Sequence, residues 1–195
     1  MIMSNYVIWI FQSVPHACVL QNLVGFDDSN TLFHGTPLAK TFPSKVAFHM
    51  NPDFPTDLLL TDNLLNSDSC MVVSSKLADA LRARNVSKLE YLPVSIVDHK
   101  GKVASKDYYI LNPLELIDCI DRKKSKFRES RITPGRIAKF EKLVIDETRI
   151  PPDRSLFRMQ GYPSIALASK ALADDLIRGN FSGLGWLALN KYPED

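Results

Sequence analysis

The sequence lacks the motifs that most often reveal an enzyme. It has 8 glycines in 195 residues. Gly183 and Gly185 are not followed by the third glycine and the helix start that a phosphate-binding loop needs. It has no Gly-x-Ser-x-Gly nucleophile motif. Its four histidines are scattered singly, without a second metal ligand at helical spacing. We therefore predict no catalytic residue, no cofactor and no metal site.

Cysteines and long apolar runs are scarce as well. The three cysteines, at positions 18, 70 and 119, form neither a disulfide framework nor a zinc-binding spacing, which favours a reducing compartment. The apolar run at residues 6–11 is far shorter than the roughly 20 residues that span a bilayer. No Lys or Arg precedes Lys40, so the basic start of a signal peptide is missing. We expect a cytoplasmic protein without a membrane partner.

One stretch of the sequence occurs twice. Residues 74–94 and 169–189 align without gaps, and nine of the 21 positions are identical. Each copy follows a short apolar run and reads as strand, helix, strand, with helices expected at 75–84 and 170–179. Ser74 or Ser75, and Ser169, are the expected N-caps, because a hydroxyl there accepts a free first-turn N–H. We interpret the two copies as one structural unit used twice.

The remaining pattern predicts an α+β fold made of two related strand-helix-strand lobes with a mixed or antiparallel sheet. We assign residues 1–125 to an N-terminal lobe and 126–195 to a C-terminal lobe, while one compact domain is also compatible with the sequence. The segment 56–65 is predicted to be a short helix that starts at Thr56. Residues 114–121 fit a helical turn and a strand equally well. Further strands are expected at 5–12, 19–24, 45–50, 89–97, 108–111, 140–145 and 156–159.

The charge is concentrated in one segment. The whole chain carries a formal charge of +2, but residues 122–142 alone hold nine basic and two acidic residues. A run of this kind is usually a solvated surface. Binding to phosphates is the sharper interpretation, yet no nucleic-acid recognition motif accompanies the charge, so we do not expect a nucleic-acid partner. We treat residues 122–137 of this segment as an exposed connector.

His34, Gly35 and Thr36 resemble the His-Gly-Thr signature of the poly-ADP-ribose polymerase family. In that family the His and Gly hold the nicotinamide riboside, a Tyr stacks on the ring and a Glu polarises the ribose. Here the next Tyr is Tyr91, and the Glu residues after it, such as Glu115, lie in no recognisable context. The tripeptide is therefore interpreted as a loop histidine before a glycine turn. An ADP-ribosyltransferase-like enzyme is kept as the remote alternative.

Several longer blocks carry a second resemblance. They are Glu90-Tyr91-Leu92-Pro93-Val94, then Tyr108-Tyr109-Ile110-Leu111-Asn112 with Asp118, Asp121 and Ser125, then Leu156-Phe157-Arg158. In this order they resemble a family of bacterial immunity proteins from polymorphic toxin systems. Its type is a myxobacterial immunity protein, and it was long known only as a domain of unknown function. The resemblance runs from about residue 43 to 190. Most of these motif residues are apolar or form turns, so they indicate a fold more than a site.

The resemblance implies a non-enzymatic inhibitor that binds and neutralises a cognate antibacterial toxin, with a nuclease as the expected toxin class. A general interaction or regulatory module of the same fold is the alternative. Nuclease inhibitors often present acidic surfaces, whereas this chain carries a basic segment, which better fits a toxin with an acidic face. The sequence does not determine the oligomeric state. The candidate toxin-contact residues are Lys123, Lys124, Lys126, Arg128 and Arg131.

Overall fold

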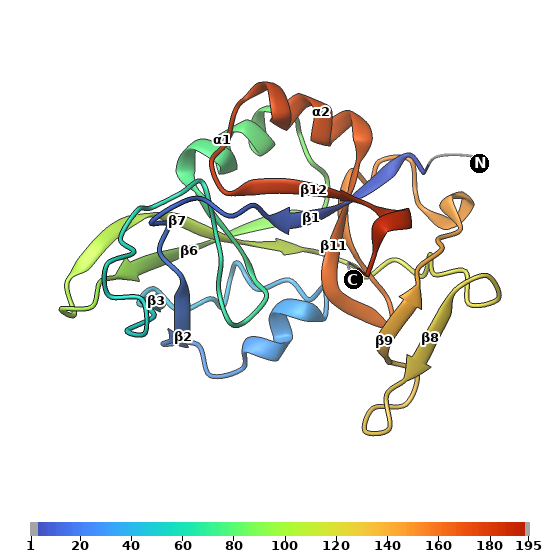
Figure 1. Ribbon diagram of the computed structural model, residues 1–195, viewed down its shortest axis with the longest axis horizontal. Coiled ribbons are helices and arrows are strands. Elements are labelled where there is room, and N and C mark those ends of the chain that lie inside the picture. Colours follow the sequence, from blue (N-terminus) through green and yellow to red (C-terminus); the bar gives the residue numbers. More distant parts are fainter. Residues whose placement is uncertain (1–3, 194–195) are drawn as a thin grey trace.

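The computed structural model describes residues 4–193 (Figure 1). Its strands are β1 (Tyr6–Phe11), β2 (Leu20–Val24), β3 (Ala47–Met50), β4 (Asn63–Leu64), β5 (Met71–Ser74), β6 (Leu89–Val97), β7 (Val103–Pro113), β8 (Lys126–Glu129), β9 (Ile137–Lys142), β10 (Leu156–Met159), β11 (Tyr162–Ser169) and β12 (Leu184–Ala188). Its α-helices are α1 (Ser75–Ala83) and α2 (Lys170–Arg178), and short 3-10 helices occupy Ser29–Phe33, Glu147–Arg149 and Leu189–Lys191. None of the helices in this part of the chain is long and apolar enough to cross a bilayer.

These strands form a mixed α+β fold, as predicted. One sheet has the order β2-β3-β6-β7-β5-β4, a second has the order β10-β11-β1-β12, and β8 pairs with β9. The β3–β6 pair is parallel, and the other pairs between named strands are antiparallel. Strand β1, from the start of the chain, lies between β11 and β12. The second sheet therefore joins residues from both predicted lobes.

The duplicated stretch is one structural unit used twice. In the first unit, β5 and β6 flank β7, and in the second, β11 and β12 flank β1. The registers agree as well: Ile110 lies opposite Val72 and Leu92, while Ile8 lies opposite Leu167 and Leu187. The third strand of the first unit follows the repeat in the sequence, whereas that of the second unit comes from the start of the chain. The shared unit is thus larger than the repeated sequence.

The two helices have matching serine caps at their N-termini and matching asparagines after their C-termini. Ser74 Oγ accepts a hydrogen bond from Leu77 N, and Ser169 Oγ accepts one from Leu172 N, each at 3.2 Å. Both serines hold the extended backbone of an N-cap, so the expected caps are confirmed at Ser74 and Ser169. After each helix an asparagine, Asn85 or Asn180, adopts a positive φ that turns the chain toward the next strand.

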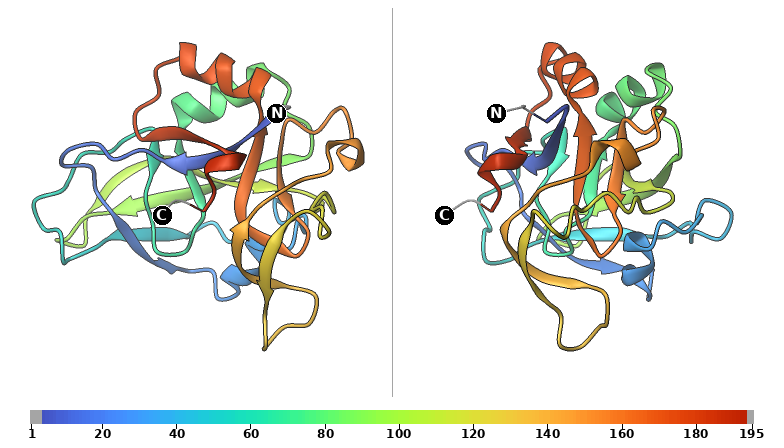
Figure 2. Two further views of the ribbon diagram at one scale, coloured as in Figure 1. Left: turned by 45° about the vertical axis from the view of Figure 1, so that its right-hand side comes forward. Right: turned by 90° about the vertical axis from the view of Figure 1, so that its right-hand side faces the viewer.

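The two helices lie side by side and cover the same side of the molecule in all three views (Figures 1 and 2). Their inward faces contain Leu77, Ala78 and Leu81 on α1 and Leu172, Ala173 and Leu176 on α2, all of them buried. These side chains belong to one apolar cluster with Trp9, Leu111 and Leu184. Both repeats therefore contribute to one core, because each helix alone covers only part of its sheet.

A carboxylate links the two units at the surface. Asp62, just before β4, accepts hydrogen bonds from Ser74 Oγ at 2.7 Å and from the backbone N and Oγ of Ser182 at 2.9 and 3.0 Å. Ser74 belongs to the first unit and Ser182 to the second. Partial burial alone would raise the pKa of Asp62, but the hydrogen bonds from both serines outweigh it and hold the pKa below its ordinary value. The ionised form of Asp62 therefore stabilises the fold.

Several local predictions are corrected. Residues 56–65 do not form a helix: Leu58 and Leu59 are exposed, and only Asn63–Leu64 forms a strand. The backbone of Leu59 instead bonds to His16 and Cys18, which prevents helical i to i+4 bonding there. Residues 114–121 form isolated bridges rather than a helix or a strand. The prediction of a basic connector is also wrong, because most of that segment belongs to the β8–β9 hairpin. The strand expected at 140–145 is part of β9, which begins earlier, at Ile137.

Truncating either inward leucine should strongly destabilise the protein. Leu81 and Leu176 are 0% exposed, so Leu81→Ala or Leu176→Ala should lower the free energy of unfolding by about 2–5 kcal/mol. Ile177, on the outer face of α2, is 59% exposed and gives the matched control. Ile177→Ala should change that free energy by no more than about 0.5 kcal/mol. Denaturant unfolding of the three variants tests this packing, and equal losses for Leu176→Ala and Ile177→Ala would contradict it.

The hydrogen bonds to Asp62 should make the free energy of unfolding depend on pH. Its folded-state pKa lies below the ordinary value of 3.8, so the stabilisation is fully present above that value and is lost as the pH falls through the folded pKa. The difference in unfolding free energy between the wild type and Asp62→Asn should therefore shrink from pH 6 to pH 3. Denaturant unfolding at each pH measures this difference. A constant difference over the whole range would show that the Asp62 charge does not stabilise the fold.

Candidate functional site

The most strongly charged surface is the basic hairpin, which we define as residues 122–142. It extends away from the body of the molecule in all three ribbon views (Figures 1 and 2). Its base is held in the core by Phe140, which is 1% exposed and meets the ring of Tyr162 at 4.9 Å. Ser125 Oγ donates to Val144 O and accepts from Val144 N, both at 3.0 Å. The hairpin is thus a fixed projection rather than a connector.

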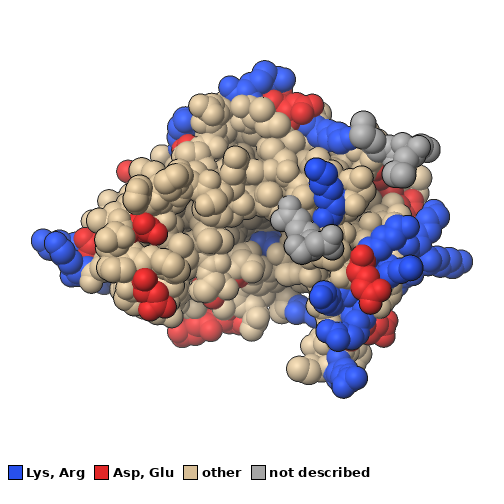
Figure 3. Space-filling model, in the orientation of Figure 1, with Lys and Arg blue, Asp and Glu red and all other residues tan. Residues whose placement is uncertain are grey.

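The charges on the hairpin repel one another. Lys126 lies opposite Lys142, and Arg128 lies opposite Lys139, with all four side chains exposed. Directly opposed like charges destabilise a strand pair. Figure 3 shows the basic side chains gathered at this end of the molecule. These opposed cations therefore weaken the strand pair rather than stabilise it.

The five predicted contact residues all lie in this hairpin and are exposed, namely Lys123, Lys124, Lys126, Arg128 and Arg131. Lys124 forms an ion pair at 3.0 Å with Asp121, and this contact lowers the pKa of the Asp121 carboxyl. The other four form no ion pair with any residue between 4 and 193. Sequence reasoning missed Lys139 and Lys142, because only the strand register places them opposite Lys126 and Arg128.

The tip of the hairpin is locally ordered. Ser130 Oγ accepts hydrogen bonds from the backbone N of Ile132 and Thr133 at 3.2 and 3.1 Å. Ile132 is 92% exposed and stands beside Arg131. An ordered tip loses little conformational entropy when it is bound. The tip therefore exposes one apolar side chain next to a cation.

The described residues contain no group of three or more His, Cys, Asp or Glu that could hold a metal ion. The thiols are also poor nucleophiles, since burial raises the pKa of Cys18 to about 11 and those of Cys70 and Cys119 to about 12. His16 has a carboxylate nearby, Asp57 at 3.6 Å, but its side chain is 80% exposed. In the part of the chain that the structure describes, the three cysteines are therefore not activated as nucleophiles.

The His-Gly-Thr tripeptide has a structural role. His34 is exposed, while Gly35 has a φ of +68° and accepts a hydrogen bond from Glu115 N at 3.0 Å. A Cβ on Gly35 would lie 2.7 Å from that nitrogen. Tyr91 packs against Arg82, whose guanidinium carbon lies 4.2 Å from the ring centroid. The glycine is therefore explained by the close approach of Glu115.

One comparison with known proteins identifies the family of this chain. A family model described as "Immunity protein family (Imm11)" matches residues 15–191. The chain belongs to this immunity protein family. No curated protein matches the chain.

The polar residues in the resembling blocks hold the Imm11 chain together. Glu90 accepts hydrogen bonds from Leu38 N at 2.8 Å, Ala39 N at 3.2 Å and Asn112 Nδ2 at 3.0 Å. It thereby fixes the loop after the His-Gly-Thr tripeptide to β6 and β7. Asp121 accepts from the backbone N of Lys123 and Lys124, both at 3.1 Å, at the foot of the hairpin. Asp121 thereby positions the start of the hairpin, while Glu90 holds a loop against the first sheet.

The structural role of Gly35 leads to a direct prediction. Gly35→Ala should lower the melting temperature, because the added methyl group collides with Glu115 N and the positive φ is strained for alanine. His34→Ala should leave the melting temperature unchanged, since this side chain is exposed. Thermal melts of both variants test this, and an NAD-turnover assay of the wild type should show no consumption. Turnover that His34→Ala abolishes would overturn the structural interpretation.

Proposed function

We propose that this protein binds a cognate antibacterial toxin and neutralises it by protein–protein contact, without catalysis. Its membership of the Imm11 immunity family is the observation that carries the proposal. The isolated histidines and the protonated cysteines are compatible with a binding role. The three free cysteines are also compatible with a cytoplasmic site of action, where thiols stay reduced.

In this proposal the basic hairpin forms part of the toxin-contact surface. Opposed cations steer an acidic partner toward the hairpin and gain stability when that partner neutralises them. The toxin face that fits this surface is acidic. If the toxin is a nuclease, contact with its acidic face would lie away from a basic nucleic-acid site. Inhibition would then act by blocking access or by holding the toxin in an inactive conformation.

Co-expression tests the proposed function. The toxin candidate is the product of the gene next to the one for this protein. Producing it alone should arrest growth, and producing both proteins should restore growth and allow the two to be purified together. A pulldown from the native cells separates this function from that of a general interaction module, which would capture a different partner. Growth arrest that persists with a stable, abundant immunity chain would reject neutralisation.

Charge reversal tests the contact surface separately. Lys126→Glu with Arg128→Glu removes two like-charge contacts, so the melting temperature should stay within about 2 °C of the wild type or rise. Association with the toxin at low salt should slow by about tenfold or more and become less sensitive to salt. The matched control reverses two exposed lysines, Lys100 and Lys106, in and beside the β6–β7 turn at the opposite end of the molecule (Figure 1). Equal association rates for the two double variants would remove the hairpin from the contact surface.

A further inference from the structure

Arg158 is a buried cation that has no carboxylate partner among residues 4–193. It lies in β10, where all four residues are buried, and is itself 2% exposed. Its Nη1 donates to Pro163 O at 2.5 Å, and its Nη2 donates to Ser69 O at 3.3 Å. Its Nε is buried and has no hydrogen-bond partner among residues 4–193. Three of the five N–H donors of this guanidinium are therefore unused within the described chain.

The other buried arginine shows how this fold normally compensates such a charge. Arg154 is 7% exposed and forms ion pairs with Glu115 at 2.6 Å and Asp153 at 2.7 Å. Arg158 donates hydrogen bonds to two carbonyl oxygens, and its guanidinium carbon lies 4.7 Å from the centroid of the Phe33 ring. No carboxylate of the described chain pairs with it. A buried charge without a counter-charge is costly. Burial lowers the pKa of Arg158 to about 10, so it is still cationic at neutral pH.

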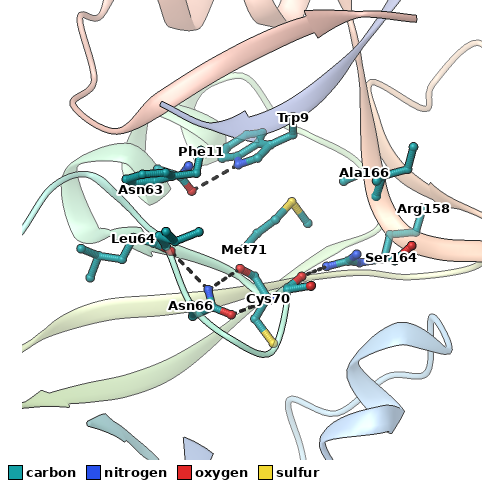
Figure 4. A pocket seen from close by; sticks show the side chains of 13 residues that line it. Trp9, Phe11, Asn63, Leu64, Asn66, Cys70, Met71, Arg158, Ser164 and Ala166 are labelled. Atoms are coloured by element: carbon teal, nitrogen blue, oxygen red, sulfur yellow. Dashed lines mark hydrogen bonds between the residues drawn. The ribbon is translucent and has the colours of Figure 1, made fainter. Parts of the chain in front are cut away.

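This unpaired cation lines a cavity of about 180 Å³. The cavity lies between the two larger sheets, with walls from β1, β10 and β11 of one sheet and from β4 and β5 of the other. Figure 3 shows that this face of the molecule is hollowed near its centre. In Figure 4 the guanidinium reaches into the space bordered by Cys70, Met71 and Ser164. Among the described lining residues Arg158 is the only charged one.

The other lining groups narrow the chemistry of a ligand. The amides of Asn63 and Asn66 already bond to neighbouring groups of the protein, so their donors are used. Trp9, Met71 and Ala166 make part of the wall apolar. A single cation beside an apolar wall favours a ligand that has one negative charge and an apolar part. The planar guanidinium group fits the two oxygens of a carboxylate. A phosphate dianion would bring more charge than one guanidinium neutralises.

We propose that this cavity binds a monocarboxylate, whose oxygens accept hydrogen bonds from the remaining Nη1 and Nη2 N–H groups of Arg158 and whose apolar part lies against Trp9 and Met71. The carboxylate comes either from a free small molecule or from a side chain of a bound protein. The site does not depend on the proposed immunity function. The bound carboxylate supplies the counter-charge that Arg158 lacks among the described residues.

Thermal melts with added sodium salts test the site on the full chain. Butyrate and phenylacetate should raise the melting temperature in a saturable way, by about 5–10 °C at concentrations near 100 times the dissociation constant. Chloride and inorganic phosphate at the same ionic strength should not. If neither carboxylate gives a saturable shift beyond that of chloride, the proposal is overturned. A phosphate shift as large as that of the carboxylates overturns the assigned ligand class.

Variants at the rim locate the effect without removing Arg158, whose loss would risk unfolding the protein. Ser164 lines the cavity and is exposed at its rim. Ser164→Glu supplies a carboxylate from the protein itself, so it should melt at a higher temperature than Ser164→Gln and lose the butyrate response. Ser164→Gln has nearly the same shape and should keep that response. Butyrate shifts of equal size in the two variants place the binding elsewhere and overturn the proposal.

A competition experiment distinguishes the two sources of the carboxylate. Saturating butyrate is added while the neighbouring-gene toxin binds to the wild-type chain. Weaker toxin binding assigns the carboxylate to an acidic side chain of the toxin. Unchanged toxin binding, together with the thermal shift, assigns the site to a free small molecule. Because the melts need no toxin, they test the cavity even if the proposed neutralisation fails.

Discussion

The structure depends on the shared apolar packing beneath α1 and α2. Neither helix is long, and each buries only three residues of its own. Together their leucines enclose Trp9 of β1 and Leu111 of β7, the corresponding positions of the two units. This packing sets the two sheets beside each other. It thereby creates the seam that Asp62 links at the surface and in which the Arg158 cavity lies.

The sequence repeat covers only part of the unit that the structure repeats. The third strand is β7 in one unit and β1 in the other, and the registers equate Tyr108 and Ile110 with Tyr6 and Ile8. These two identities are too few to be noticed before the strands are aligned. In the first unit the middle strand follows the repeat in the sequence, and in the second unit it precedes the repeat. Both orders are possible because the packing of the three strands is the same in each.

Local periodicity predicted much of the fold, while tertiary pairing decided the rest. The repeat helices and β6 were predicted to within a residue, because their apolar spacing and serine caps are local signals. Residues 56–65 have an apolar pattern that fits a helix, yet their backbone bonds to residues 16–20. The five basic contact candidates were visible as a charge run. Their opposition to Lys139 and Lys142 depends on the register of the hairpin. The lack of a carboxylate beside Arg158 within residues 4–193 becomes evident only from its neighbours in space.

The central claim is neutralisation by binding, and titration of toxin activity tests it most directly. A fixed amount of the purified neighbouring-gene toxin is assayed with increasing amounts of this protein. Binding predicts that activity falls in proportion to the added protein, reaches its minimum at a fixed molar ratio and returns when the two proteins are separated. Inactivation of excess toxin by trace amounts of the protein, or full toxin activity at a large molar excess, would contradict the account.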